Sequence, residues 1–142
     1  MILKIQKLHE DAIIPTYAHP DDSGMDLYAI SETFVPIRGQ VLVKTGISIQ
    51  LPPGTEAQIR PRSGLALKHG IGVANSPGTV DEGYRGEIGV ILENHGESAF
   101  MVAKGMKIAQ MVICPVLRPE IEIVDNLSET QRGSGGFGST GI

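Results

Sequence analysis

The glycine- and proline-rich stretch 72–87 carries the side chains best suited to chemistry. It places Asp81, Tyr84 and Arg85 close together, after a Ser-Pro-Gly triplet at 76–78 that predicts a tight turn. An aspartate beside a pocket can accept a proton from water, and a tyrosine ring can pack against a sugar. A glycine-rich surface turn with a solvated aspartate would use the same residues, so this stretch alone leaves both interpretations open.

The elements around this stretch are expected to be strands, at 73–74 before it and at 88–92 after it. Because the stretch is too rich in Gly, Pro, Asn and Asp for a helix, we predict a β-hairpin or a short bent loop. Backbone N–H and C=O groups stand at fixed spacing in a hairpin. They can therefore imitate one edge of a base pair.

Arg62 and Ser63 form a second candidate group, placed just before an apolar run that ends at Gly70. This pattern predicts a short helix with Ser63 as its N-cap and Gly70 as its stop. The start of a helix presents free N–H groups and a partial positive charge, so the pair could hold a phosphate. An ordinary helix cap beside a surface arginine fits the same residues.

Alternating apolar residues predict the strands that would position these groups. The clearest run covers 41–51 and is expected to bend at Gly46. Further strands are predicted at 3–6, 107–116 and 121–123.

Two isolated polar residues each allow two interpretations. Gln110 lies inside the apolar run 107–116, so its amide either bonds a core group or faces a ligand. Asp26 ends a polar loop and could help to place a metal, or it could be an ordinary loop carboxylate.

The glycine- and serine-rich tail 132–142 cannot build a core and is expected to be mobile in solution. A plain linker has no need for Arg132 or Phe137. Successive N–H groups of such a segment can bind an anion, arginine can clamp phosphate oxygens, and phenylalanine can stack on a base. The tail therefore predicts a lid that orders on a phosphorylated, base-bearing ligand.

Composition points to one all-β domain. The chain has 142 residues with 18 Gly and 9 Pro, which suits many turns. Its net charge of −4 gives no sign of a nucleic-acid or membrane partner. A single cysteine argues against a disulfide scaffold and suits the cytoplasm. Neither a signal peptide nor an apolar run of the ~20 residues that span a membrane is expected.

Taken together, the segments resemble the trimeric deoxyuridine triphosphate nucleotidohydrolases, the dUTPases. Five short motifs of that family are matched in order, at 23–27, 61–66, 72–87, 105–110 and 132–141. One departure occurs in the fourth motif, where Met106 replaces the usual acidic residue. It puts local hydrogen bonding or subunit contacts in doubt, but not the chemistry, because Gln110 is present.

The resemblance implies a distorted β jelly roll (a β-clip fold) with one short helix at 1–127 and a flexible lid at 128–142. It implies a homotrimer whose sites are shared between subunits, with Mg²⁺ as cofactor. The implied reaction is attack of water on the α-phosphorus of dUTP, giving dUMP and pyrophosphate. This reaction would remove dUTP and supply dUMP for thymidylate synthesis.

The resemblance also implies a role for each matched residue. Asp81 would be the catalytic base, and Tyr84 would stack on deoxyribose. Asp26 would reach the metal only through water. The uracil contacts would come from Asn75, Gly78 and Thr79, the phosphate contacts from Arg62, Ser63, Gly64, Gln110 and Arg132, and further tail contacts from Ser134, Phe137, Gly138, Ser139 and Thr140.

Three other functions remain as alternatives. A dCTP deaminase of related fold would need a different acid–base arrangement on the hairpin. A non-catalytic nucleotide-binding trimer would be favoured by loss of Asp81 or of the tail, and both are present. A structural protein of capsid type would leave the polar residues of the motifs unexplained.

Overall fold

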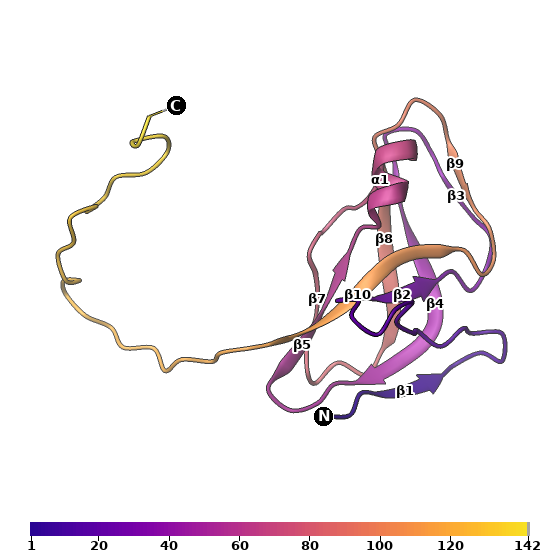
Figure 1. Cartoon of the computed structure of the whole chain (residues 1–142), viewed down its shortest axis with the longest axis horizontal. Helices are drawn as coiled ribbons and strands as arrows, with labels where there is room; N and C mark the ends of the chain where they lie inside the picture. The colour runs from indigo at the N-terminus through magenta and orange to yellow at the C-terminus, as the bar shows by residue number, and fades with distance from the viewer. Residues whose placement is uncertain (142) are drawn as a thin grey trace.

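The structure is a computed structural model, and it describes residues 1–141. Strands form almost all of its regular structure, with a single short helix in the described part (Figure 1). The elements are β1 (Lys4–Lys7), β2 (Met25–Tyr28), β3 (Thr33–Val35), β4 (Gln40–Gln50), β5 (Thr55–Arg60), α1 (Ser63–His69), β6 (Ile71–Val73), β7 (Gly78–Val80), β8 (Glu87–Asn94), β9 (Phe100–Val102) and β10 (Lys107–Pro115).

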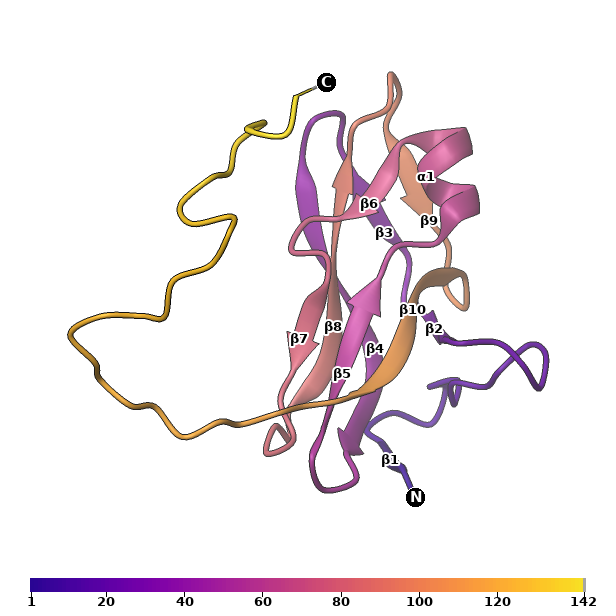
Figure 2. The ribbon, with the colours of Figure 1, turned by 60° about the vertical axis from the view of Figure 1, so that its left-hand side comes forward.

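Two four-stranded antiparallel sheets make up the body. One has the strand order β1-β4-β8-β6 and the other β2-β10-β5-β7, while β3 and β9 form a separate pair. Figure 2 shows the two sheets facing each other across the body. This architecture confirms the predicted all-β jelly roll with one short helix.

The core lies between the two sheets. Alternating residues of β5 and β8 are buried, as expected for strands with one face inward. The largest fully buried side chains come from both sheets and include Leu27, Ile47, Ile88, Leu92, Ile108 and Met111.

The long strand β4 bends where the sequence predicted. Gly46 has a φ of 72°, and the pairing register with β8 shifts between Lys44 and Ser48. A positive φ is favourable for glycine because it has no Cβ, so Gly46 can sit in this β-bulge. The bulge lies beside the start of β8, directly after the 72–87 stretch.

Helix α1 follows the prediction with one correction. Gly70 ends the helix in the left-handed conformation, at a φ of 65°. Ser63 is not the N-cap, since the capping position is Arg62 and no side chain bonds a backbone N–H there. Arg62 is extended and its carbonyl already accepts the first helical bond, from the N–H of Ala66.

The 72–87 stretch is a wide hairpin that connects the two sheets. Its outer arms β6 and β8 pair with each other, Val73 opposite Leu92. Between them β7 crosses over and pairs with β5 of the other sheet, Thr79 opposite Gln58. The stretch is therefore anchored in both sheets, which is more than a simple two-stranded hairpin provides.

The chain leaves the body soon after β10 (Figure 1). A backbone bond from the N–H of Val116 to the carbonyl of Gly54 marks this exit. The predicted strand at 121–123 is wrong: Ile121 and Ile123 are 87% and 96% exposed and belong to no strand. An extended segment needs a sheet edge to pair with, and here it runs clear of the body.

Within residues 1–141, no helix is both long and apolar enough to cross a membrane.

Candidate functional site

One cleft gathers the residues predicted to hold phosphates. Arg62, Ser63 and Gly64 come from the start of α1, and Gln110 comes from β10. The cleft has a volume of about 460 Å³. Its lining is completed by Ala18, Asp22, Ser23, Gly24, Asp26 and Lys107.

Strand register brings these side chains together. Gln110 lies opposite Asp26 of β2 on one side and opposite Arg60 of β5 on the other. A register shift between Lys107 and Ala109 breaks the alternation of β10. In a regular strand, positions three apart point to opposite faces. The irregularity instead brings both Lys107 and Gln110 to this cleft.

Lys107 is the residue that sequence reasoning missed here. A regular period places it on the face opposite Gln110, and the bulge that changes this has no clear signal in the sequence. The sequence offers one indication of a cationic site here, the two lysines Lys104 and Lys107 on either side of Gly105 and Met106.

Asp26 is paired with two cations in the cleft. Its carboxylate lies 2.7 Å from Lys107 Nζ and 3.4 Å from Arg62 Nε, and its side chain is only 16% exposed. The hydrogen bond from Lys107 to Asp26 raises the pKa of Lys107 above its ordinary value. Lys107 therefore stays protonated at neutral pH, and the stabilisation from its positive charge is lost as the pH rises through that raised pKa.

Gln110 both bonds the backbone and borders the cleft. Its Nε2 donates a hydrogen bond of 3.0 Å to the carbonyl of Pro61, and its amide lines the cleft. Gly24 makes room for it, since a Cβ at that position would lie 2.6 Å from Gln110 Oε1. Gly24, two residues before Asp26, thus leaves space for the amide of Gln110.

A second, smaller cleft contains the residues predicted for catalysis and sugar recognition. It has a volume of about 160 Å³ and includes Asp81, Tyr84 and Thr79. The remaining lining residues are Val80, Glu87, Ile88 and Gly89. Asp81 is exposed, so its carboxylate is accessible to a ligand and to water.

Tyr84 is held in a defined position although it is 46% exposed. Its hydroxyl donates a hydrogen bond of 3.0 Å to the carbonyl of Glu87. Its ring packs directly on Gly86, where a Cβ would lie 2.5 Å from the ring carbon Cζ.

Asn75, in the turn before β7, lies beside Gly78, the first residue of that strand. A Cβ on Gly78 would be 3.2 Å from Asn75 Nδ2, so the amide covers the buried glycine. Neither residue lines the cleft that contains Asp81.

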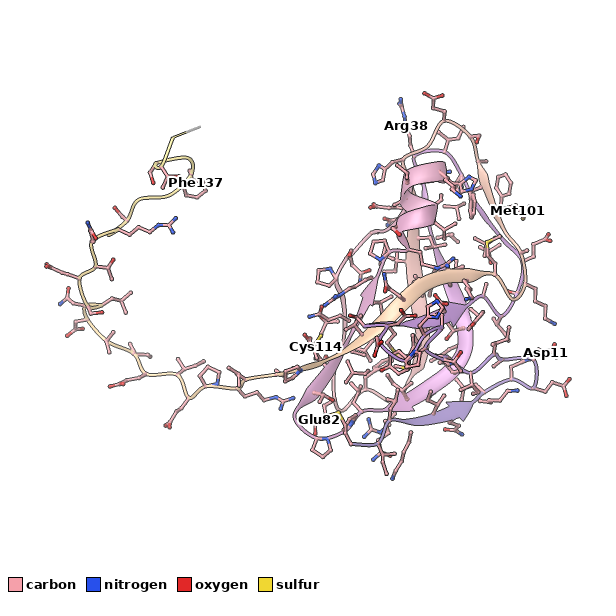
Figure 3. All side chains as sticks on the ribbon, in the orientation of Figure 1. Asp11, Arg38, Glu82, Met101, Cys114 and Phe137 are labelled. Carbon is pink, nitrogen blue, oxygen red and sulfur yellow. The ribbon has the colours of Figure 1, made fainter. Side chains whose placement is uncertain are left out.

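The tail residues predicted for the site lie away from both clefts. Figure 3 shows Phe137 far from the body, and its side chain is fully exposed. Arg132 donates through Nε to the carbonyl of Gly135, 2.9 Å away. Ser134, Gly138, Ser139 and Thr140 likewise line neither cleft.

The two clefts share no lining residue. The larger one offers cations, hydroxyl and amide groups, which suit phosphate. The smaller one pairs an exposed carboxylate with an aromatic ring.

Over residues 1–141, no cluster of three or more His, Cys, Asp or Glu side chains could hold a metal ion. Asp22 and Asp26 are the two carboxylates that line the larger cleft.

Comparisons with known proteins identify the family of the chain. The family model described as dUTPase matches residues 10–141. The deoxyuridine 5'-triphosphate nucleotidohydrolase of Gloeothece citriformis is 68% identical over 142 residues, covering 100% of this chain and 98% of that protein. The enzyme of the same name from Clostridium tetani is 63% identical, covering 98% and 96%.

A solved structure supports the fold over the whole chain. The dUTPase of Staphylococcus bacteriophage 80alpha with dUPNHPP has a TM-score of 0.92 and 25% sequence identity, covering 99% of each chain. The family match, the close relatives and the two clefts lead to one conclusion. The chain belongs to the dUTPase family.

Proposed function

We propose that Asp81 is the base with which this dUTPase hydrolyses dUTP. Asp81 takes a proton from water as the water oxygen bonds to the α-phosphorus, and the bond from that phosphorus to the bridging oxygen breaks. The products are dUMP and pyrophosphate. The observation that carries the proposal is the exposed carboxylate of Asp81 in one cleft with Tyr84 and Thr79.

The hairpin and Tyr84 select the nucleoside. Backbone groups at Gly78 and Thr79, with the amide of Asn75, bond the edge of uracil. Cytosine presents the opposite donor and acceptor at that edge, so it would leave buried groups unpaired. The phage 80alpha dUTPase is known with dUPNHPP, and a nucleotide of this class fits the same roles here. The ring of Tyr84 covers deoxyribose and leaves no space for a 2′-hydroxyl.

The larger cleft binds the triphosphate through Arg62, Ser63, Gly64 and Gln110. Arg62 and Lys107 in its lining are opposed by Asp22 and Asp26, so the cleft has no net formal charge. A triphosphate therefore needs further positive charge, and Arg132 of the tail supplies part of it.

Bound Mg²⁺ would supply further positive charge at this cleft. Mg²⁺ prefers oxygen ligands and keeps several waters, so phosphate oxygens can hold it with Asp26 acting through a water. When bound, it neutralises charge that develops on the leaving pyrophosphate. Chelation with EDTA is expected to lower turnover sharply, and added Mg²⁺ should restore it.

A homotrimer brings the separate groups into one site. The smaller cleft is well below the ~300 Å³ of a typical ligand pocket, and the phosphate cleft shares none of its residues. Apolar side chains on the exposed segment after β10, at Leu117, Ile121 and Ile123, are 87% exposed or more. A second copy of the chain would bury them. The lid, which we place at 128–142, would then close over a neighbouring subunit's site.

The alternatives have less support. The family match favours hydrolysis over deamination of dCTP. A non-catalytic trimer would not need the exposed Asp81, and a capsid-type protein would not need the phosphate cleft.

The lone Cys114 is a free thiol, which suits the reducing cytoplasm as the compartment of this enzyme.

The first test is pyrophosphate release with Mg²⁺ from dUTP, UTP, dTTP and dCTP, measured side by side. Release from dUTP alone is the expected result. Ammonia from dCTP would point to a deaminase, and no turnover of any nucleotide would point to a binding protein.

A further inference from the structure

Two carboxylates hold the loop 81–87 against strand β4 and the turn that follows it. Glu87 Oε1 accepts a hydrogen bond of 2.9 Å from the N–H of Gly46, and Glu82 Oε2 accepts one of 3.0 Å from the N–H of Gly54. Both glycines have a positive φ, 72° and 76°. The loop that carries Asp81 and Tyr84 is thus fixed at each of its ends.

We propose that Glu87 is a positioning residue for Tyr84, and that through Tyr84 it sets the preference for deoxyribose over ribose. The proposal rests on the role given to Tyr84 in the proposed function. It adds a residue that touches neither base nor phosphate in that scheme.

The hydrogen bond from the Gly46 N–H fixes the side chain of Glu87. The bulge in β4 interrupts the ladder between Lys44 and Ser48, so the buried N–H of Gly46 needs another acceptor. Glu87 Oε1 provides it, and Lys44 Nζ lies 3.6 Å from the other carboxylate oxygen. The side chain of Glu87 is 27% exposed, so this contact is shielded in part from water.

The backbone of Glu87 in turn holds Tyr84. The carbonyl of Glu87 is the acceptor of the Tyr84 hydroxyl, at 3.0 Å. The ring also lies against Gly86, which has no side chain to push it away. Fixing residue 87 at the bulge therefore fixes the far end of the tyrosine ring. A ring whose hydroxyl end is held both by Gly86 and by the Glu87 carbonyl can exclude a 2′-hydroxyl, whereas a ring free to move would give way to it.

The test compares Glu87→Ala with Glu87→Gln. Glutamine keeps an oxygen that can accept the Gly46 N–H, so the ratio of kcat/KM for dUTP over UTP should stay within about twofold of wild type. Alanine removes the acceptor, and the ratio should fall about five- to tenfold, the loss of roughly one hydrogen bond. Glu87→Asp withdraws the oxygen by one methylene and should resemble alanine. It replaces the alanine variant if that protein does not fold.

A double variant tests whether Glu87 acts through the tyrosine hydroxyl. Tyr84→Phe removes that hydroxyl and should lower the same ratio. If Glu87 acts through it, then Tyr84→Phe with Glu87→Ala should have the ratio of Tyr84→Phe alone. An unchanged ratio in Glu87→Ala and Glu87→Asp, or independent effects in the double variant, would overturn the proposal.

A second readout separates this proposal from the proposed function. Hydrogen exchange at the amide of Gly46 reports the contact with Glu87 without any nucleotide. Protection should be present in wild type and Glu87→Gln and lost in Glu87→Ala. A wild-type enzyme that does not prefer dUTP to UTP would contradict the role of Tyr84. Unchanged Gly46 protection in Glu87→Ala would contradict the role of Glu87.

Discussion

Among single residues, two glycines leave the space that larger neighbouring side chains occupy. Gly24 leaves room for the amide of Gln110, and Gly86 leaves room for the ring of Tyr84. Gly24 also lines the larger cleft, whereas Gly86 lines neither cleft. Substitutions at such positions should therefore alter binding and selectivity before they alter the fold.

Asp81→Asn is expected to abolish turnover while nucleotide binding persists. The amide keeps the size and hydrogen bonding of the carboxylate, but it cannot take a proton from water. General-base catalysis contributes roughly 10²–10⁴-fold, so kcat should fall by at least about a hundredfold. Pyrophosphate release measures the loss, and calorimetry with a non-hydrolysable dUTP analogue measures binding. Turnover near the wild-type rate would refute the assignment of the base.

Gly24→Ala should weaken the phosphate cleft. The new methyl group would overlap Gln110 Oε1 and displace the amide from the carbonyl of Pro61. We expect kcat/KM for dUTP to fall about tenfold, since an unpaired polar group costs ~1–3 kcal/mol. Gly83→Ala is the matched control, because a Cβ there meets nothing within 4 Å. Equal losses in the two variants would show that Gln110 is not the cause.

Among the elements, an irregular strand contributes to each of the two clefts. The bulge in β10 brings Lys107 to the same cleft as Gln110, and the bulge in β4 leaves the Gly46 N–H free to bond Glu87. Regular strands would place these groups on opposite faces or pair them within the ladder. The two bulges therefore allow contacts that regular strands would not allow.

The end of helix α1 gives a stability prediction. Gly70→Ala would place a Cβ in the left-handed region and 2.6 Å from the backbone nitrogen of Gly96. The left-handed conformation alone costs roughly 1–2 kcal/mol for a residue with a side chain. We expect the melting temperature to fall by several degrees at fixed protein concentration, measured by calorimetry. An unchanged melting temperature would mean that the turn can rearrange freely.

Sequence reasoning recovered the elements whose patterns are local. The strand at 41–51, its bend at Gly46 and the helix end at Gly70 all follow from periodicity or from glycine chemistry. The role of Lys107 depends on a bulge, and the crossing of β7 to the opposite sheet depends on pairing with distant β5. Neither the bulge nor the long-range strand pairing can be predicted from the residues of one segment alone. The false strand at 121–123 shows the same limit, because a strand exists only where an edge is available to pair with it.

In the molecule as a whole, the extended C-terminal segment is structurally separate from the body over most of its length (Figure 1). Glu82, at the base of the body in Figure 3, joins the two through an ion pair of 3.1 Å with Arg118. The strands of the body are hydrogen-bonded in its sheets. In the segment 130–141, the backbone hydrogen bonds join residues three apart and form local turns. The segment should therefore be separable from folding and assembly but not from catalysis.

Removal of residues 132–142 should leave the oligomer intact and cripple turnover. The truncated protein keeps both sheets and the apolar segment at 117–127 but loses Arg132 and Phe137. Light scattering should give the mass of the full-length oligomer, while kcat/KM falls by at least about a hundredfold through loss of charge and closure. A monomeric or unfolded product would contradict the assignment of this segment as a lid.

The separation of the two clefts has a consequence for mixtures of variants. If sites are shared between subunits, chains carrying Asp81→Asn and chains carrying Arg62→Ala are each inactive alone but defective in different halves of the site. Refolded together in equal amounts, they should form mixed assemblies in which about one quarter of the sites combine an intact half from each parent. Two inactive variants of this chain would then restore activity to one another when mixed, although neither is active by itself.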